Sequence, residues 1–572
     1  MIYQENEKMK ILLVAINAKY IHSNLAACSL RAYARRHVSR RDVAIEIAEH
    51  TINRQQDDIL RDIAGRRPDM VCFSCYIWNM AYVEEIIRDF AKVCPDVPIW
   101  LGGPEVSYDA EEVLARLSQV SGIMKGEGEQ TFAELCEGKP LEEIPGITFR
   151  QRDGSICENE WREPVDMDEL PFVYEDMGEF ENRILYYETS RGCPFSCSYC
   201  LSSVDKRLRF KSLSLVKEEL SVFLREEVPQ VKFVDRTFNS KASHAMEIWK
   251  FLLENDNGVT NFHFEISADL LNEEELALME KMRPGLIQLE IGVQSTNSET
   301  VREIQRTMDF EKLSRNVMRI RGMNNIHQHL DLIAGLPFEN LKSFEKSFDD
   351  VYRLRPDQLQ LGFLKVLKGS RMEEKKADYG LEHKDMPPYE VLYTDWLSFE
   401  EISELKGIEE MVEAYYNSRQ FGHALEELEK EYASPYRMYR ELWIYHEKNG
   451  GLGMQHKRSA RYELLLGFMG DVCKKGENYC RELLAYDYYL RENAKSRPLF
   501  AGENRMEKEQ ARLFYERESK EHEYLPSYAG YDKNQLRRMT HLEYFPELGK
   551  TVLFDYMEKN PLNQEARTVE IK

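Results

Sequence analysis

The chain has 572 residues, with 77 Lys and Arg against 100 Asp and Glu, so its formal net charge is −23. This length predicts about three domains, because single domains run to about 100 to 200 residues. The acidic balance argues against nucleic acid as a partner, since a nucleic-acid surface needs clustered basic side chains.

Targeting signals and cysteine usage narrow the cellular setting. No run of 18 apolar residues occurs, and the first residues lack the basic-then-apolar order of a signal peptide. Eleven scattered cysteines favour a reducing compartment without disulfides. We therefore expect a cytoplasmic protein with no membrane partner.

The first part of the chain alternates short apolar runs with amphipathic helical stretches. The expected strands are 11–16, 43–48, 70–76, 98–101 and 122–124, and the expected helices are 25–36, 57–65, 81–93, 111–117 and 130–137. This alternation predicts a doubly wound, Rossmann-like α/β domain over residues 8–137. Such sheets bind ligands outside the carboxyl ends of their strands.

Loops at that edge of the sheet contain the candidate ligand contacts. They are Tyr20 and His22 after the first strand, Tyr76 after the third, Gly102, Gly103 and Glu105 after the fourth, and Gly126, Glu127 and Gly128 after the fifth. Glycines let the backbone approach a bulky flat ligand. Each glycine alone also fits an ordinary tight turn.

Residues 138–183 are rich in proline and weakly periodic, which predicts a linker with a hairpin around Asp153 and Gly154. A second alternation of strands and helices follows. Its expected strands are 184–188, 231–235, 261–266, 286–291, 329–333 and 358–363. In βα barrels, whether open or closed, the chemistry gathers at the carboxyl ends of the strands.

A C-x3-C-x2-C motif of Cys193, Cys197 and Cys200 directly follows the first of these strands. Three thiolates on one tight loop can hold three irons of a 4Fe-4S cluster and leave the fourth iron open. The nearest other cysteines, Cys157 and Cys473, are too distant in sequence to belong to the same loop. Three unrelated thiols, or half of a zinc site, are the alternatives.

This motif resembles the cluster site of the radical S-adenosylmethionine (SAM) superfamily. The resemblance implies a partial (β/α)6 barrel over residues 184–371, in which SAM binds the open iron and is cleaved to a 5′-deoxyadenosyl radical. It also implies SAM contacts: Tyr199 beside the adenine, Asp235 at the amino group, Glu265 and Gln294 at strand ends that hold SAM, and Gly335 in a turn near the adenine. The orientation of Glu290 stays open, because strand alternation can point it away from the barrel axis.

The first domain, placed directly before such a barrel, resembles the cobalamin-binding domain fused to radical SAM enzymes. The resemblance implies that the corrin lies between the sheet and the barrel. The chain departs from the wider cobalamin pattern, because none of its 13 histidines lies in a D-x-H-x-x-G motif. The axial ligand of cobalt is therefore undecided: His22 is the nearest candidate, and a hydrogen-bonding role is its alternative.

Residues 372–572 carry apolar side chains at helical spacing and predict a mainly helical domain. The leading hypothesis is a cobalamin-dependent radical SAM methyltransferase that acts on an unactivated carbon of an unidentified, small-molecule or other substrate. A reductase such as flavodoxin or ferredoxin would supply electrons. The alternatives are a radical rearrangement, ring contraction or cyclisation without methyl transfer, and a non-catalytic iron-sulfur sensor or assembly protein.

Overall fold

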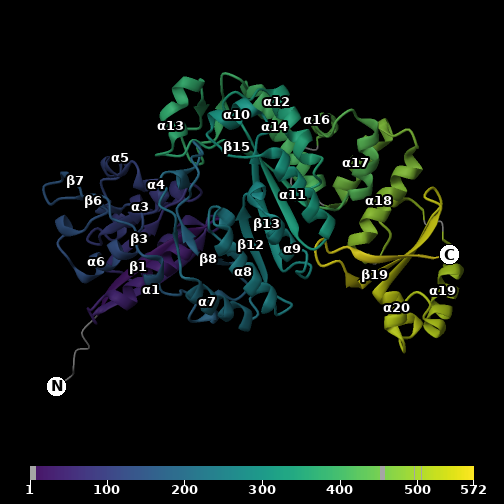
Figure 1. Ribbon diagram of the computed structural model, residues 1–572, viewed down its shortest axis with the longest axis horizontal. Coiled ribbons are helices and arrows are strands. Elements are labelled where there is room, and N and C mark those ends of the chain that lie inside the picture. The colour runs from purple at the N-terminus through teal and green to yellow at the C-terminus, as the bar shows by residue number, and fades with distance from the viewer. Residues whose placement is uncertain (1–7, 451–457, 495, 504–505, 572) are drawn as a thin grey trace.

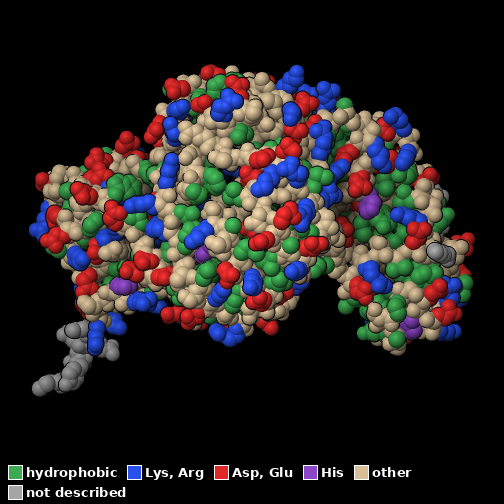
Figure 2. Space-filling model, viewed as in Figure 1, with side chains coloured by type: hydrophobic (Ala, Val, Ile, Leu, Met, Phe, Trp, Pro, Cys, Tyr) green, Lys and Arg blue, Asp and Glu red, His purple; other side chains and the backbone are tan. Residues whose placement is uncertain are grey.

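The computed structural model describes residues 8–450, 458–494, 496–503 and 506–571. In Figure 1 the chain runs from an α/β domain (purple to blue), through a barrel (teal), to helices and a small sheet (green to yellow), with the termini at opposite ends. Among the described residues, no helix is both long and apolar enough to cross a membrane. Figure 2 shows Asp and Glu side chains spread among Lys and Arg over the visible face.

The amino-terminal sheet has the order β2-β1-β3-β4-β5-β6-β7. Its strands are β1 (Met9–Asn17), β2 (Val43–Thr51), β3 (Met70–Ser74), β4 (Ile99–Gly102), β5 (Gly122–Met124), β6 (Ile147–Arg150) and β7 (Ile156–Glu158). The first five strands are parallel, as predicted, and the hairpin expected around Asp153 and Gly154 forms β6 and β7. The segment expected to be only a linker therefore extends this sheet past residue 137.

Helices cover both faces of that sheet. They are α1 (Leu25–His37), α2 (Gln56–Gly65), α3 (Met80–Val93), α4 (Pro104–Ser107), α5 (Ala110–Arg116) and α6 (Glu129–Glu137). Ile63 of α2, Phe90 of α3 and Val113 of α5 share one core with one face of the sheet, and Tyr33 of α1 and Phe132 of α6 share the other. The doubly wound prediction is confirmed, and the carboxyl ends of β1, β3, β4 and β5 lie at one edge of the sheet.

The central sheet has the order β15-β14-β13-β12-β11-β8, and all of its strand pairs are parallel. Its strands are β8 (Leu185–Tyr187), β11 (Gln230–Phe233), β12 (Asn261–Ile266), β13 (Ile287–Gln294), β14 (His327–Ala334) and β15 (Gln358–Phe363), and a short pair, β9 (Ser190–Arg191) with β10 (Arg209–Phe210), flanks the cysteine loop. The helices between them are α7 (Leu213–Arg225), α8 (Ala242–Glu254), α9 (Glu273–Met279), α10 (Ser298–Glu303), α11 (Phe310–Met323) and α12 (Leu341–Tyr352). All six predicted strands are present, so the sheet is the predicted partial barrel.

The carboxyl-terminal region is mainly helical, as predicted, but it also contains strands that the helical prediction missed. The helices are α13 (Arg371–Lys375), α14 (Phe399–Met411), α15 (Gly422–Leu428), α16 (Pro435–Lys448), α17 (Arg458–Val472), α18 (Glu477–Arg491), α19 (Lys508–Glu521) and α20 (Lys533–Met539). A hairpin of β16 (Glu382–His383) and β17 (Val391–Tyr393) lies between α13 and α14, and an antiparallel sheet of β18 (Thr540–Phe545), β19 (Lys550–Lys559) and β20 (Ala566–Ile571) ends the fold.

Candidate cofactor site

The cysteine loop lies between β9 and β10 at the carboxyl end of β8, as the motif predicted. Cys193 and Cys197 are buried and Cys200 is partly buried. The loop is held tightly, because the Ser203 hydroxyl donates to the carbonyls of Cys197 (2.9 Å) and Cys200 (2.7 Å). Gly192 has φ +89°, and a Cβ there would lie 2.5 Å from the carbonyl oxygen of Arg207, so only glycine fits at the entry to the loop.

Polar atoms without partners surround this loop. Among the described residues, the buried Ser198 Oγ, Arg306 Nε and Gln294 Oε1 have no hydrogen-bond partner. Arg306 lies 3.9 Å from Cys197 Sγ and 3.4 Å from the Tyr199 hydroxyl. Gln294 adopts φ +72°, a strained backbone conformation for a residue other than glycine. Three grouped thiols beside unsatisfied polar atoms fit a cluster with a polar ligand on its open iron.

The carboxylate oxygens of Asp235 already have hydrogen-bond partners within the protein. It is 1% exposed, and its carboxylate accepts hydrogen bonds from Thr189 N (3.0 Å), Thr189 Oγ1 (2.6 Å) and Ser190 Oγ (2.6 Å). Burial raises the pKa of Asp235 to about 6, against these hydrogen bonds. Asp235 therefore fixes the segment that leads into the cysteine loop, and its predicted contact with the SAM amino group stays a prediction.

The turn at Gly335 packs against another part of the protein, although it was expected to lie near the adenine of SAM. Gly335 has φ +89°, and a Cβ there would lie 2.7 Å from Val391 of β17. The carboxyl-terminal hairpin thus covers this turn. The sequence could not predict this contact, because Val391 lies in a strand outside the barrel.

Glu339, in the same turn, gives a prediction for stability. Both Ser295 Oγ (2.7 Å) and Ser347 Oγ (2.9 Å) donate to Glu339 Oε1, and burial raises the pKa of Glu339 to about 7. Because the pKa of Glu339 is higher in the folded state than its unfolded value near 4.5, protonation of this carboxyl stabilises the fold. This stabilisation is complete below pH 4.5 and is lost as the pH rises through 7. In Glu339→Gln the free energy of unfolding should not show this decrease with pH, which amounts to up to about 3 kcal/mol in the wild type.

The measurement is the thermal unfolding midpoint of the wild type and Glu339→Gln at pH 5 and pH 8. Between pH 5 and pH 8, the midpoint of the variant should rise relative to the midpoint of the wild type. An identical pH dependence of the two midpoints would contradict the prediction.

The inner face of the barrel is polar, which settles the orientation of Glu290. Glu265, Glu290 and His329 lie in register on neighbouring strands, so Glu290 faces the same side as Glu265. Lys232 Nζ lies 2.9 Å from Glu290, and His263 Nε2 lies 3.0 Å from it. Burial and the charge of Glu290 raise the pKa of Glu265 to about 7. The barrel interior therefore offers charged groups of both signs.

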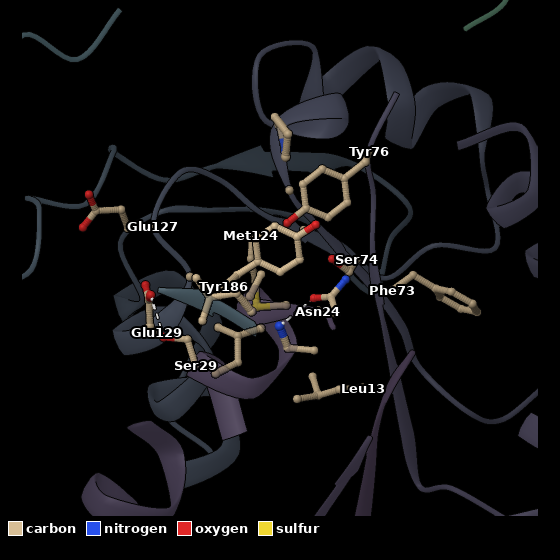
Figure 3. Close-up of a pocket in the computed structure, with 18 of the residues that line it drawn as sticks. Leu13, Asn24, Ser29, Phe73, Ser74, Tyr76, Met124, Glu127, Glu129 and Tyr186 are labelled. Atoms are coloured by element: carbon tan, nitrogen blue, oxygen red, sulfur yellow. Dashed lines mark hydrogen bonds between the residues drawn. The ribbon is translucent and has the colours of Figure 1, made fainter. Parts of the chain in front are cut away.

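A cavity of about 650 Å³ lies at the carboxyl ends of the amino-terminal strands, between that sheet and the barrel. The amino-terminal domain contributes strand residues such as Leu13, Phe73 and Met124, and the barrel contributes Tyr186, Glu188, Arg191, Val234 and Arg236. Figure 3 shows Tyr76 and Tyr186 near its centre, Ser29 bonded to Glu129 below them, and Glu127 to one side. The cavity is therefore built by both domains.

Most of the predicted cobalamin contacts line this cavity. They are His22, Tyr76, Gly102, Gly103, Gly126, Glu127 and Gly128. Gly103 has φ +116°, and a Cβ there would lie 2.4 Å from the carbonyl oxygen of Cys75, so glycine is needed at this strand end. The shape, with glycine backbone and mostly apolar walls, fits a flat and bulky cofactor.

His22 makes a hydrogen bond from its ring. Its Nδ1 lies 2.7 Å from the Tyr186 hydroxyl, across the boundary between the two domains. Burial, with the charges of Lys19 and Lys232, lowers the pKa of His22, which favours the neutral ring. The geometry therefore gives His22 the hydrogen-bonding role, and its contact with cobalt stays a prediction.

Tyr20 and Glu105 were expected at the cofactor and lie elsewhere. Tyr20 is 68% exposed, with the Arg183 guanidinium 5.2 Å from its ring centre. Glu105 is buried and accepts a hydrogen bond from the Tyr389 hydroxyl, with Lys368 Nζ 3.5 Å away. The buried Glu105 thus joins the amino-terminal domain to the segment after the barrel, because the short helix α4 turns its side chain away from the cavity.

Glu105→Ala should lower the free energy of unfolding by about 1 to 3 kcal/mol, because it leaves Tyr389 and Lys368 without this buried partner. Urea unfolding of Glu105→Ala and of the exposed control Glu111→Ala measures the effect. Equal stability of the two variants would show that the contact contributes nothing.

Arg191 is a site residue that the sequence analysis missed. Its guanidinium lies 2.6 Å from Glu129, 3.4 Å from Glu127 and 2.9 Å from Glu188. These contacts tie the loop after β5 to the strand end that carries the cysteine loop. Its position two residues before Cys193 is the feature of the sequence that could have identified it.

Three families match the chain. The B12 binding domain matches residues 11–136, the radical SAM superfamily matches residues 187–351, and a family described as protein of unknown function (DUF4080) matches residues 377–568.

Similar proteins include methyltransferases. An uncharacterised methyltransferase of Pyrococcus horikoshii is 24% identical over 332 residues, covering 55% of this chain and 71% of that protein. The cobalamin-dependent radical SAM methyltransferase TokK of Streptomyces tokunonensis is 24% identical over 353 residues, covering 55% of this chain and 50% of that protein. The chain thus spans only half the length of TokK.

Solved structures share the fold. The cobalamin-dependent SAM radical enzyme OxsB, with aqua-cobalamin bound, has a TM-score of 0.59 and 16% identity, over 85% of this chain and 80% of that chain. The radical SAM methyltransferase TsrM of Kitasatospora setae, with cobalamin and a 4Fe-4S cluster bound, has a TM-score of 0.53 and 17% identity, over 67% of this chain and 78% of that chain.

The two matched cofactor domains coincide with the two halves of the site described above. The strand ends that form one side of the cavity lie in the B12 binding domain, and the cysteine loop lies in the radical SAM domain. The cofactors of this pair of domains are cobalamin, SAM and a 4Fe-4S cluster. The chain therefore combines a B12 binding domain, a domain of the radical SAM superfamily and a carboxyl-terminal region that matches DUF4080.

Proposed function

We propose that the protein is an enzyme, a cobalamin-dependent radical SAM methyltransferase that methylates an unactivated carbon. The observation that carries the proposal is the cavity shared by the two domains, since barrel residues such as Tyr186 and Arg236 form one of its walls. A cobalamin in this cavity would face the domain that holds the cluster. Methyltransferases among the similar proteins favour methyl transfer over a rearrangement.

The bound cofactors would supply the radical and methyl-transfer chemistry, and the protein would bind and orient them. Cys193, Cys197 and Cys200 would hold the cluster, and Tyr199 with Gln294 would contact SAM. The glycines at 102, 103, 126 and 128 would let the backbone approach the corrin. Arg191 would keep the two halves of the site in register through Glu127, Glu129 and Glu188.

The test is anaerobic reconstitution with iron, sulfide and hydroxocobalamin, followed by reaction under reduction with SAM labelled in its methyl group. We expect 5′-deoxyadenosine among the products and the label on the bound cobalamin. Formation of 5′-deoxyadenosine without label on cobalamin would favour a rearrangement. An intact cluster that cleaves no SAM would favour the sensor or assembly role.

The reaction needs an electron for each cleavage of SAM, and we propose a flavodoxin or ferredoxin as its donor. The support is chemical: the cluster must be reduced by one electron, which such carriers supply. Replacing a chemical reductant with flavodoxin and its reductase should sustain 5′-deoxyadenosine formation.

A further inference from the structure

A second cavity, of about 740 Å³, opens beside the cysteine loop. It is lined by residues on both flanks of that loop, including Gly192 and Arg209, and by Trp161 of the segment after β7. The two cavities adjoin, because they share the lining residues Tyr108, Gly126, Glu127, Glu188, Arg191, Val234 and Arg236. A molecule in the second cavity would therefore lie next to both the cluster loop and the cobalamin cavity.

Basic side chains outnumber the three acidic ones, Glu127, Glu188 and Asp205, in the lining of this second cavity, although the chain as a whole is acidic. The basic side chains are Lys125, Arg162, Arg191, Lys206, Arg207, Arg209 and Arg236. Six of them are already engaged: Lys125 with Glu158, Arg162 with Glu134, Arg191 and Arg209 with Glu127, Arg207 with Glu163, and Lys206 with the Ser196 hydroxyl.

Arg236 differs from these six. Among the residues that the structure describes, its guanidinium has no hydrogen bond and no ion pair, and the residue is exposed. It follows β11 directly, at the junction of the two cavities. It lines both cavities, together with residues of the amino-terminal domain such as Tyr108 and Gly126.

We propose that the second cavity is the substrate site and that Arg236 binds an oxyanion, a carboxylate or phosphate, of a small anionic substrate. The inference rests on the proposed function and names its substrate class. A guanidinium offers a planar pair of donors that matches an oxyanion, and such charge-assisted hydrogen bonds are stronger than those between neutral groups. Because the neighbouring cations already have partners, Arg236 is the group available to the ligand.

The test uses the holoenzyme, loaded with cluster, cobalamin and SAM, and inorganic phosphate as the probe, with the neutral trimethyl phosphate for comparison. Calorimetric titration should show phosphate binding at least about tenfold more tightly than trimethyl phosphate. Arg236→Gln should weaken phosphate binding by about tenfold or more, whereas Arg236→Lys should retain most of it. Arg207→Gln, on the rim of the same cavity, is the matched control and should bind phosphate as the wild type does.

Four results would overturn the inference. The wild type does not bind phosphate, or Arg236→Gln binds it unchanged. Phosphate binds the protein without cobalamin but not the loaded holoenzyme, which would assign the guanidinium to the phosphodiester of that cofactor. Arg236→Gln weakens SAM binding as much as phosphate binding, which would assign it to the SAM carboxylate. Methyl labelling of cobalamin, measured on the same preparations, tests the proposed function separately, since it requires no substrate.

Discussion

Cys197→Ala should abolish cleavage of SAM, with at least about a hundredfold loss of 5′-deoxyadenosine formation under reduction. The reason is coordination: three thiolates hold three irons, and removal of one leaves a second iron without a protein ligand. Cys197 is buried beside Arg306, and the nearest cysteines in sequence outside the loop are Cys157 and Cys473. The measurement is iron and sulfide content together with SAM products after anaerobic reconstitution.

The matched control is Cys94→Ser, which changes a partly buried thiol at the end of α3, far from the loop in sequence. This control should keep full iron content and activity, and Cys197→Ala should still bind cobalamin, because its cavity is lined mainly by the other domain. Full SAM cleavage by Cys197→Ala would refute the assignment of the cluster to this loop.

The sequence could predict the features that depend on local pattern. Both parallel sheets follow from apolar runs alternating with amphipathic helices, and the place of the cysteine loop follows from its position after a strand. The cavity edge was predictable for the same reason, because the carboxyl ends of parallel strands meet at one edge. Glycines such as Gly103 lie there because backbone packs against backbone.

What the sequence could not predict are contacts between elements far apart in the chain. Glu105 follows a strand as a cofactor contact would, but its partner Tyr389 lies 284 residues away. Asp235 has the position of a SAM ligand, but Thr189 and Ser190 from another strand end satisfy its carboxylate. Glu290 could point either way until the register with Glu265 was known.

The role of cobalamin can be separated from that of the cluster by filling the cavity between the domains. Ser74 ends β3, lines the cavity and lies near Tyr76 and Asn24 in Figure 3. Ser74→Trp would place an indole in the space that a corrin or its nucleotide tail would need. We expect cobalamin binding to weaken by about fivefold to a hundredfold, since overpacking a formed pocket costs about 1 to 3 kcal/mol.

The same variant should keep its iron and should still cleave SAM, because Cys193, Cys197 and Cys200 lie in the other domain. It should not place the methyl label of SAM on cobalamin. Ser155→Trp, in the exposed turn of the β6–β7 hairpin, is the control and should behave as the wild type in every assay. Normal cobalamin binding by Ser74→Trp would show that the cavity is not the cobalamin site. Loss of SAM cleavage together with cobalamin binding would show that the two cofactor sites depend on one another. In that case this variant could not separate methyl transfer from SAM cleavage.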